Sequence, residues 1–533
     1  MGQNDRWHTR RVFLGRAAAA VAVPGAAVLA TRLISESAGS GPASDSAAAA
    51  GRRAQFARRH VAENSLPGDP RWPIRHLGGT DAIVGYTSRA SVQAGEPVQL
   101  FVSTTARSFK VMAYRMGWYS GDRARLVWHS GSVLGRRQRR LTLRHGTNTV
   151  TTAWEPSLIL PTHDWPEGSY LLRLDAESGA QRFVPLTIRS PSTAGKVVIK
   201  NSVPTWQAYN MWGGYDLYNG PGGLADYNNR SLAVSLDRPY DLDGAFMFLA
   251  HERNLIELAE RMGLPLAYET AMDLAADPAL LSGASALVSC GHDEYWSPPE
   301  RANVTAARDA GVNIAFLGAN AMFRRTRLDR TSLGGNRLVI CYKTSYLQDP
   351  MYGEDNALVT SDWREPPHPD PESSLTGTLY ESNPVDADFV VVSPSAWMFR
   401  GTGVRAGTRF RGLVGIEYDR VNPDSPVERP IEVLSHSRLN CRGINSFADS
   451  AYYTHSGGAG VFNTGTMRWV RSFTGNIGFG IDQRTGRFVR KVTANVLRAF
   501  ADGPAAAKFP AHDNLAEMHE WAGDPIGSQH SLW

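Results

Sequence analysis

The sequence predicts two folded parts, an antiparallel β-sandwich followed by an α/β domain with a doubly wound parallel sheet. Between residues 79 and 190, segments rich in β-branched and aromatic residues alternate with turn signals at intervals of roughly ten residues, which is typical of a sandwich of the immunoglobulin type. After residue 195 the pattern changes, and apolar strands alternate with segments of helical spacing. Such alternation is typical of a parallel sheet covered by helices.

The expected sandwich strands are short segments bounded by turn residues. They are Val98–Ser103, Phe109–Tyr114, Ser169–Leu174 and Phe183–Arg189. The run Ser-Pro-Ser-Thr-Ala-Gly at residues 190–195 has the composition of a linker. We therefore expect the sandwich over residues 79–190 and the α/β domain over residues 196–503.

The α/β domain is predicted from its buried strands and capped helices. Ala284–Cys290 is apolar on both faces, as expected of a buried parallel strand. Ser297, followed by two prolines and Glu300, has the signature of a helix N-terminus. The other expected strands are Lys196–Lys200, Leu264–Tyr268 and Val312–Leu317, with the pattern resuming over Gly460–Val470; the expected helices are Glu252–Met262, Met272–Leu281, the helix from Ser297 to about Asp309, and Thr493–Ala501, before an extended tail over residues 504–533.

Composition excludes several classes of protein. The 533 residues are 42% hydrophobic and 20% charged, which is typical of a globular chain and not of a disordered one. The 56 basic and 51 acidic residues give a net charge of +5, which is too weak to indicate a nucleic-acid partner. The three cysteines form no C-x-x-C pair, so we expect neither a disulfide framework nor a structural zinc site.

The N-terminus has the features of an export signal. Arg10 and Arg11 precede the alanine-rich run Ala17–Ala30, which has the length of a signal-peptide core and is too short to span a bilayer comfortably. We predict a signal peptide over residues 1–50, recognised by the twin-arginine translocase, and a linker or disordered segment over residues 51–78. Because no other segment stays apolar for about 18 residues, we expect an exported protein, extracellular or in the cell envelope, without a stable membrane anchor.

Polar and aromatic side chains follow three of the expected parallel strands at the point where each strand ends. These segments are Thr205–Tyr218, Gly291–Trp296 and Gly318–Asn320. In an open parallel sheet, ligands bind in the crevice beyond the carboxyl ends of the strands. A single tyrosine in such a loop is usually a packed ring, and a single asparagine usually forms a turn. The convergence of all three segments therefore predicts a functional site at this edge.

These segments also carry a family resemblance. The motifs T-W-Q-A-Y-N from Thr205, W-G-G from Trp212, G-H-D-E-Y-W from Gly291 and F-L-G-A-N from Phe316 resemble the large subunit of N,N-dimethylformamidase, as does Y-R-M-G-W-Y from Tyr114. The resemblance covers roughly residues 70 to 505. It implies that the α/β domain is catalytic and has a fold related to the class I glutamine amidotransferases.

The resemblance further implies a mononuclear Fe(III) held by two tyrosines and one glutamate. Glu294 corresponds to the carboxylate and Tyr209 to one tyrosine, while His292 and Asn320 correspond to neighbouring catalytic residues. Tyr170 is the expected second tyrosine, from its spacing. The competing tyrosines are Tyr215 and Tyr218 near Tyr209, and Tyr240 and Tyr295 for the second position.

Such a site would hydrolyse the C–N bond of a small amide. Three anionic oxygen ligands suit an oxidised, Lewis-acidic iron that activates water for attack on the amide carbon. His292 would take up or return a proton, and Asn320 would orient the amide or stabilise the oxyanion. The resemblance also implies a small accessory subunit or a homo-oligomer as a partner.

Two other functions are compatible with the same residues. Cys290 and His292 together would suit a cysteine-nucleophile amidohydrolase, although a cysteine inside an apolar strand is more often a buried structural thiol. A secreted carbohydrate-binding or cell-wall-binding protein would instead use an aromatic cleft for stacking on sugar rings. The expected lining of such a cleft, which would also serve an amide substrate, is Trp206, Trp212, Tyr215 and Trp296.

Overall fold

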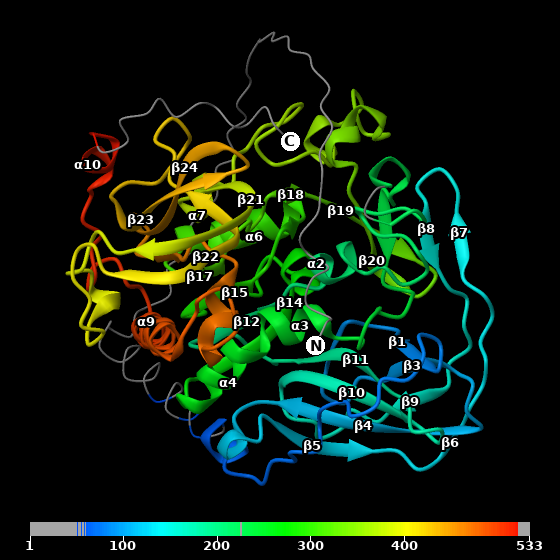
Figure 1. The fold of residues 1–533 in the computed structure, drawn as a ribbon. Helices are drawn as coiled ribbons and strands as arrows, with labels where there is room; N and C mark the ends of the chain where they lie inside the picture. The colour runs from blue at the N-terminus through cyan, green and yellow to red at the C-terminus, as the bar shows by residue number, and fades with distance from the viewer. Residues whose placement is uncertain (1–50, 52–54, 56–57, 59, 224–225, 521–533) are drawn as a thin grey trace, which may run out of the picture.

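The computed structural model describes residues 51, 55, 58, 60–223 and 226–520, so the predicted signal peptide lies outside the described residues. Within the described part the fold is mixed α/β and rich in strands (Figure 1). The immunoglobulin-like and amidotransferase-like arrangements remain predictions.

Two packed sheets form the N-terminal part. One has the order β1-β3-β9 and the other β2-β11-β10-β4-β5, with β6 paired to β4. The strands are β1 (Ile83–Thr87), β2 (Ser91–Gln93), β3 (Val98–Thr104), β4 (Ser108–Met116), β5 (Ala124–His129), β6 (Val133–Leu134), β9 (Leu158–Leu160), β10 (Gly168–Ala176) and β11 (Gln181–Arg189), and a separate hairpin joins β7 (Thr142–Arg144) to β8 (Thr149–Thr151). All four predicted strands are confirmed as β3, β4, β10 and β11, and side chains of both sheets share one apolar core.

A seven-stranded sheet forms the centre of the second part, in the order β14-β12-β15-β17-β25-β24-β23. Its strands are β12 (Val197–Asn201), β14 (Leu266–Thr270), β15 (Ala286–Gly291), β17 (Asn313–Gly318), β23 (Ile431–Cys441), β24 (Ile444–Thr454) and β25 (Gly460–Asn463). The first five in this order are parallel, as predicted, whereas β24 and β23 extend the sheet in antiparallel fashion.

Helices cover both faces of this sheet, so neighbouring residues of one strand enter different cores. On β12, Val197 and Ile199 pack into the core that contains α4 and α9, while Val198 packs into the core that contains α5 and α6. The helices are α2 (Val203–Ala208), α3 (Phe246–His251), α4 (Arg253–Arg261), α5 (Ala271–Ala276), α6 (Pro298–Asp309), α7 (Ser373–Thr376), α8 (Arg468–Arg471), α9 (Gln483–Ala501) and α10 (Leu515–Glu520).

Helix boundaries differ from the predictions where a cap was missed. The Ser297 side chain accepts a hydrogen bond from the Glu300 amide and starts α6, as predicted. Helix α9 begins ten residues before the predicted Thr493, because the Asp482 side chain caps it by accepting from the Thr485 amide. The segment expected to continue as strand after residue 460 instead turns into α8, and the expected extended tail contains α10.

Three smaller sheets surround the carboxyl edge of the main sheet. They are β13-β20-β19, β16-β18 and β21-β22. Their strands are β13 (Ala233–Ser235), β16 (Tyr295–Trp296), β18 (Arg324–Arg325), β19 (Arg327–Thr331), β20 (Gly334–Ile340), β21 (Leu379–Val390) and β22 (Arg409–Arg420). Among these strands, β16, β18 and β22 contribute to the site described below.

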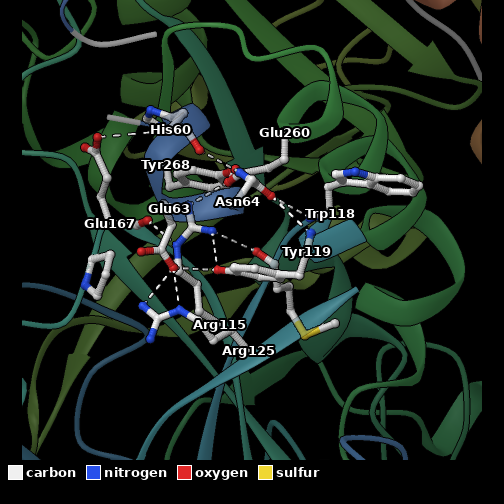
Figure 2. A network of polar contacts seen from close by, with 12 residues as sticks. His60, Glu63, Asn64, Arg115, Trp118, Tyr119, Arg125, Glu167, Glu260 and Tyr268 are labelled. Atoms are coloured by element: carbon white, nitrogen blue, oxygen red, sulfur yellow. Dashed lines mark hydrogen bonds and ion pairs between the residues drawn. The ribbon is translucent and has the colours of Figure 1, made fainter. Parts of the chain in front are cut away.

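A buried ion pair joins the two parts of the chain (Figure 2). The Arg115 guanidinium on β4 lies 2.6 Å from Oε1 of Glu260 on α4, and both side chains are at most 1% exposed. Glu260 also accepts hydrogen bonds from Tyr268 and Asn64, and Arg115 donates to the Tyr119 hydroxyl at 2.9 Å. Although burial opposes ionisation, Arg115 keeps the pKa of the Glu260 carboxyl below its usual value. The Y-R-M-G-W-Y motif therefore forms part of an interface and not of the strand-end site.

Removing one member of this pair should destabilise the chain strongly. Arg115→Ala leaves a buried carboxylate without its cation, and we expect the free energy of unfolding to fall by about 3–5 kcal/mol in urea denaturation. Arg71→Ala is the control, because Arg71 pairs with Asp69 while 71% exposed and should cost less than about 1 kcal/mol. An equal loss of unfolding free energy in the two variants would contradict the claim that the Arg115–Glu260 pair stabilises the chain.

Candidate functional site

The three predicted segments meet at one edge of the main sheet. Strands β12, β15 and β17 are parallel neighbours, so their carboxyl ends point the same way. Strand β12 leads into α2 and the following loop with Tyr209 and Tyr218, β15 into Gly291–Trp296, and β17 into Asn320. The predicted convergence is therefore confirmed.

Glu294 lies at the centre of this cluster and is 1% exposed. The Tyr209 hydroxyl donates to its Oε2 and the Tyr218 hydroxyl to its Oε1, each at 2.5 Å. The two hydroxyl oxygens are 3.0 Å apart, and the two rings stack with centroids 4.7 Å apart. Three oxygen-bearing side chains thus meet at one point.

Basic side chains surround these oxygens. Arg324 Nε lies 3.2 Å from Glu294 Oε1, and Lys343 Nζ lies 3.0 Å from the centroid of the Tyr218 ring. His292 Nε2 lies 3.0 Å from the Tyr209 hydroxyl and 3.4 Å from Glu294 Oε2. Although burial opposes ionisation, His292 and Arg324 hold the pKa of Glu294 well below its usual value. Glu294 is therefore a carboxylate.

The other side of His292 faces a residue that sequence reasoning missed. Glu417 on β22 has its Oε2 3.7 Å from His292 Nδ1 and accepts a hydrogen bond from Asn320 Nδ2 at 2.9 Å. Burial alone would lower the pKa of His292, but Glu417 and Glu294 raise it above its usual value. Glu417 stands in β22 with no motif around it, so no local signal in the sequence distinguishes it from a surface acid.

Asn320 is held in place by its backbone. Its φ of 59° lies in the left-handed region, which asparagine tolerates better than most residues. Its amide donates to Asp419 Oδ1 at 2.7 Å, while its side-chain Oδ1 is buried and has no hydrogen-bond partner among the described residues. A buried, unpartnered acceptor beside His292 and Glu417 is suited to a ligand N–H or O–H.

A buried lysine fixes the loop that carries Glu294. Lys200 Nζ on β12 lies 2.8 Å from Asp293 Oδ2, also pairs with Glu300, and lies 3.5 Å from the centroid of the Trp296 ring. Thr205 Oγ1 accepts the Glu294 amide at 3.1 Å. Asp293 is engaged by Lys200 and Ser289, so it belongs to this support and not to the oxygen cluster.

The placement of Tyr170 in the site is corrected by the structure. Its ring stacks on Trp165 inside the core of the N-terminal sheets, and its hydroxyl donates to the Pro166 carbonyl at 2.7 Å. Tyr218, one of the competing tyrosines, stands at Glu294 instead. Spacing along the chain favoured Tyr170, but a β-strand of the N-terminal part carries it away from this edge.

The remaining competitors form no hydrogen bond to Glu294 among the described contacts. The Tyr295 ring stands edge-on beneath the pair, 6.4 Å from the Tyr209 ring and 6.5 Å from the Tyr218 ring. Tyr240 packs edge-on against Trp206. The backbone carbonyl of Tyr215 accepts from Arg238 at 2.9 Å.

The three tryptophans predicted to line an aromatic cleft are engaged by other described residues. Trp296 is fully buried and donates to the Asp293 carbonyl, and Trp212 packs edge-on against Trp154. Trp206 is 6% exposed and donates to Glu252 Oε1. It does line a small, mostly apolar cavity that reaches Tyr209, together with Pro185, Tyr240, Leu242, Phe246, Met247 and Phe248.

The donor set at Glu294 fits a hard metal ion. Within residues 60–223 and 226–520, no group of three or more His, Cys, Asp and Glu side chains is placed to hold a metal. The cluster differs from such groups because two of its three oxygen-bearing side chains are tyrosines. Loss of the two phenolic protons would leave three anionic side chains facing one another, which is the ligand chemistry that a trivalent ion prefers.

Comparison with known proteins places most of the chain in one family. The family model described as N,N-dimethylformamidase beta subunit-like, C-terminal, matches residues 110–480. No curated protein matches the chain. A cycloisomaltooligosaccharide glucanotransferase of Paenibacillus sp., solved with cycloisomaltoheptaose, is 11% identical, with a TM-score of 0.14, over 25% of this chain and 18% of its own, so that likeness carries no argument.

Cys290 is placed as a structural residue. It lies in β15 at 1% exposure, and burial raises the pKa of its thiol well above the usual value, which keeps it protonated and unreactive. Cys341 and Cys441 are likewise buried and free.

We expect none of the three thiols to react with a thiol reagent such as DTNB in the folded protein, and all three to react after denaturation. Rapid labelling of Cys290 without denaturant, together with loss of activity, would restore the cysteine-nucleophile mechanism.

Proposed function

Because the chain belongs to the N,N-dimethylformamidase beta subunit-like family, we propose that it is an iron-dependent hydrolase that cleaves the C–N bond of a small amide. The observation that carries this proposal is the meeting of Tyr209, Tyr218 and Glu294, with two phenolic hydroxyls on one buried carboxylate. The family supports an amidohydrolase in general; the metal and the substrate are the finer parts of the proposal.

Tyr209, Tyr218 and Glu294 would hold a mononuclear Fe(III). A free tyrosine has a pKa of about 10, so metal binding would have to displace both phenolic protons. The adjoining Arg324 favours this, because a buried cation beside the cluster stabilises anionic oxygens. When bound, the iron would supply Lewis acidity for water and for the amide carbonyl.

The reaction adds the elements of water across the amide C–N bond and releases a carboxylic acid and an amine. His292 Nε2, next to Tyr209, would take the proton from the attacking water and return it to the leaving nitrogen. Glu417, facing His292 Nδ1, would hold the imidazole in place and stabilise it while protonated. Asn320 would orient the amide through its unpartnered Oδ1.

The cavity beside Tyr209 would take the apolar substituent of the amide. Its walls of Trp206, Tyr240 and Met247 offer carbon atoms and few hydrogen-bonding groups. The polysaccharide-binding alternative lacks this support, because Trp206 and Trp296 are buried and Trp212 packs edge-on against Trp154.

Export is part of the proposal. The twin-arginine segment that suggests it lies outside the described residues. Within the described ranges, the helices are too short or too polar to cross a membrane. A small accessory subunit or a homo-oligomer also remains a prediction.

The proposal is tested by loading the full chain with iron and measuring amine release from N-alkylformamides and N-alkylacetamides. We expect wild-type turnover, and His292→Gln should lower kcat by about 10²–10⁴, as for loss of a general acid–base. Glu417→Gln should lower kcat. It should also move the pH profile to lower pH, because Glu417 raises the pKa of His292.

The matched control is His455→Gln, a histidine that pairs with Asp309 away from the cluster, and its activity should stay within a factor of about two. An iron-loaded wild type that releases no amine from either series, or a His292→Gln variant with full activity, would contradict the proposed chemistry.

A further inference from the structure

An exposed basic segment runs from the end of β6 through β7. We call residues 134–144 the arginine strip. Its arginines are all exposed, and none forms an ion pair with a described residue. They are Arg136, Arg137, Arg139, Arg140 and Arg144. In Figure 1 the hairpin that ends the strip runs in cyan along the outer edge of the molecule.

The strip concentrates the net charge of the chain. No Asp, Glu or Lys occurs between residues 131 and 150, and the five arginines equal the whole formal charge of +5. The rest of the sequence is therefore balanced. Salt screens the fields of charges that lie far apart on a surface. These five arginines lie within one short segment, so their electrostatic attraction for an anionic partner adds up.

The backbone of the strip is held, so its arginine side chains are presented to solvent. The Arg136 carbonyl accepts the Thr104 amide at 2.9 Å, and the Arg139 carbonyl accepts Trp154 Nε1 at 2.9 Å. Between them, Gln138 donates to the carbonyls of Val102 and Glu155. A surface of this kind binds its partner without first having to order its own backbone.

The neighbouring side chains indicate the kind of partner. Leu134 is 78% exposed and Leu141 38% exposed, and both lie within the strip. Single-stranded nucleic acids and sugars are bound by aromatic stacking, yet residues 131–145 contain no Phe, Tyr or Trp. Proteins that lie on a lipid surface instead combine arginines, which bind headgroup phosphates, with leucines, which enter the boundary of the acyl chains.

We propose that the arginine strip is a peripheral docking site for an anionic phospholipid surface. The five guanidinium groups would bind headgroup phosphates, and Leu134 and Leu141 would enter the interface beside them. Binding is reversible and sensitive to salt, and it is independent of the amide chemistry proposed above.

The test is co-sedimentation of the full chain with vesicles of phosphatidylglycerol and phosphatidylcholine, or of phosphatidylcholine alone, at 50 mM and 500 mM NaCl. We expect binding to the anionic vesicles at low salt and a loss of at least about tenfold at high salt. Replacing all five strip arginines by glutamine should lower partitioning at low salt by at least about tenfold. L134S/L141S should lower it severalfold while leaving the salt dependence.

The matched control carries five Arg→Gln changes at exposed positions outside the strip. These are Arg75, Arg400, Arg405, Arg411 and Arg487. Because the predicted apolar run at residues 17–30 would itself bind lipid, the decisive readout is the difference between the two five-Gln variants in the same chain. Thermal unfolding of both variants at the wild-type temperature establishes that they are folded.

Three results would overturn the proposal. They are absence of binding to anionic vesicles at low salt, equal binding by the strip variant and its control, and binding to heparin or DNA as tight as to lipid with no effect of L134S/L141S. The last result would assign the strip to a soluble polyanion instead.

Discussion

A buried carboxylate after a parallel strand needs hydrogen-bond donors or cations as partners. The architecture around the site follows from that requirement. Glu294 is removed from water, so leaving it unpaired would cost several kcal/mol. It is met by hydroxyls from one strand end, by His292 from its own loop and by Arg324 from β18. Each partner requires its own segment to turn inward at the same edge of the sheet.

The supports behind this cluster serve the same requirement. Lys200 holds the loop through Asp293, and Thr205 binds the Glu294 amide from the preceding strand end. Glu417 and Asn320 form the outer wall on the far side of His292. The site therefore lies on loops that follow the strand ends, and the contacts of Lys200 and Thr205 hold the loop that carries Glu294 in place.

Sequence reasoning found the parts of the fold whose signals are local. The strands Val197–Asn201, Ala286–Gly291 and Asn313–Gly318 were predictable because a strand buried on both faces is apolar at nearly every position. Strands β21–β24 were not, because many of their buried positions carry polar residues, so that no continuous apolar run marks them in the sequence. Glu294 and Tyr209 were likewise found because their motifs follow such strands within a few residues.

The sequence offered several candidate site residues without ranking them, and their positions in the fold decide among them. Tyr170 and Tyr218 are both tyrosines near polar neighbours, and only the packing of the two parts shows that one is enclosed by its own sheets and the other reaches Glu294. Glu417 contacts His292 from a strand more than a hundred residues later in the sequence. Trp296 packs in the core, with Lys200 over its ring.

The central claim is that Tyr209, Tyr218 and Glu294 together form one metal site, and iron content with a visible spectrum tests it most directly. Purified wild type and Tyr170→Phe should each carry about one iron per chain with a tyrosinate-to-iron charge-transfer band. Tyr218→Phe should lose most of the metal and shift or lose that band, and Glu294→Ala should lose the metal. Full iron content with an unchanged band in Tyr218→Phe, or loss of both in Tyr170→Phe, would contradict the account.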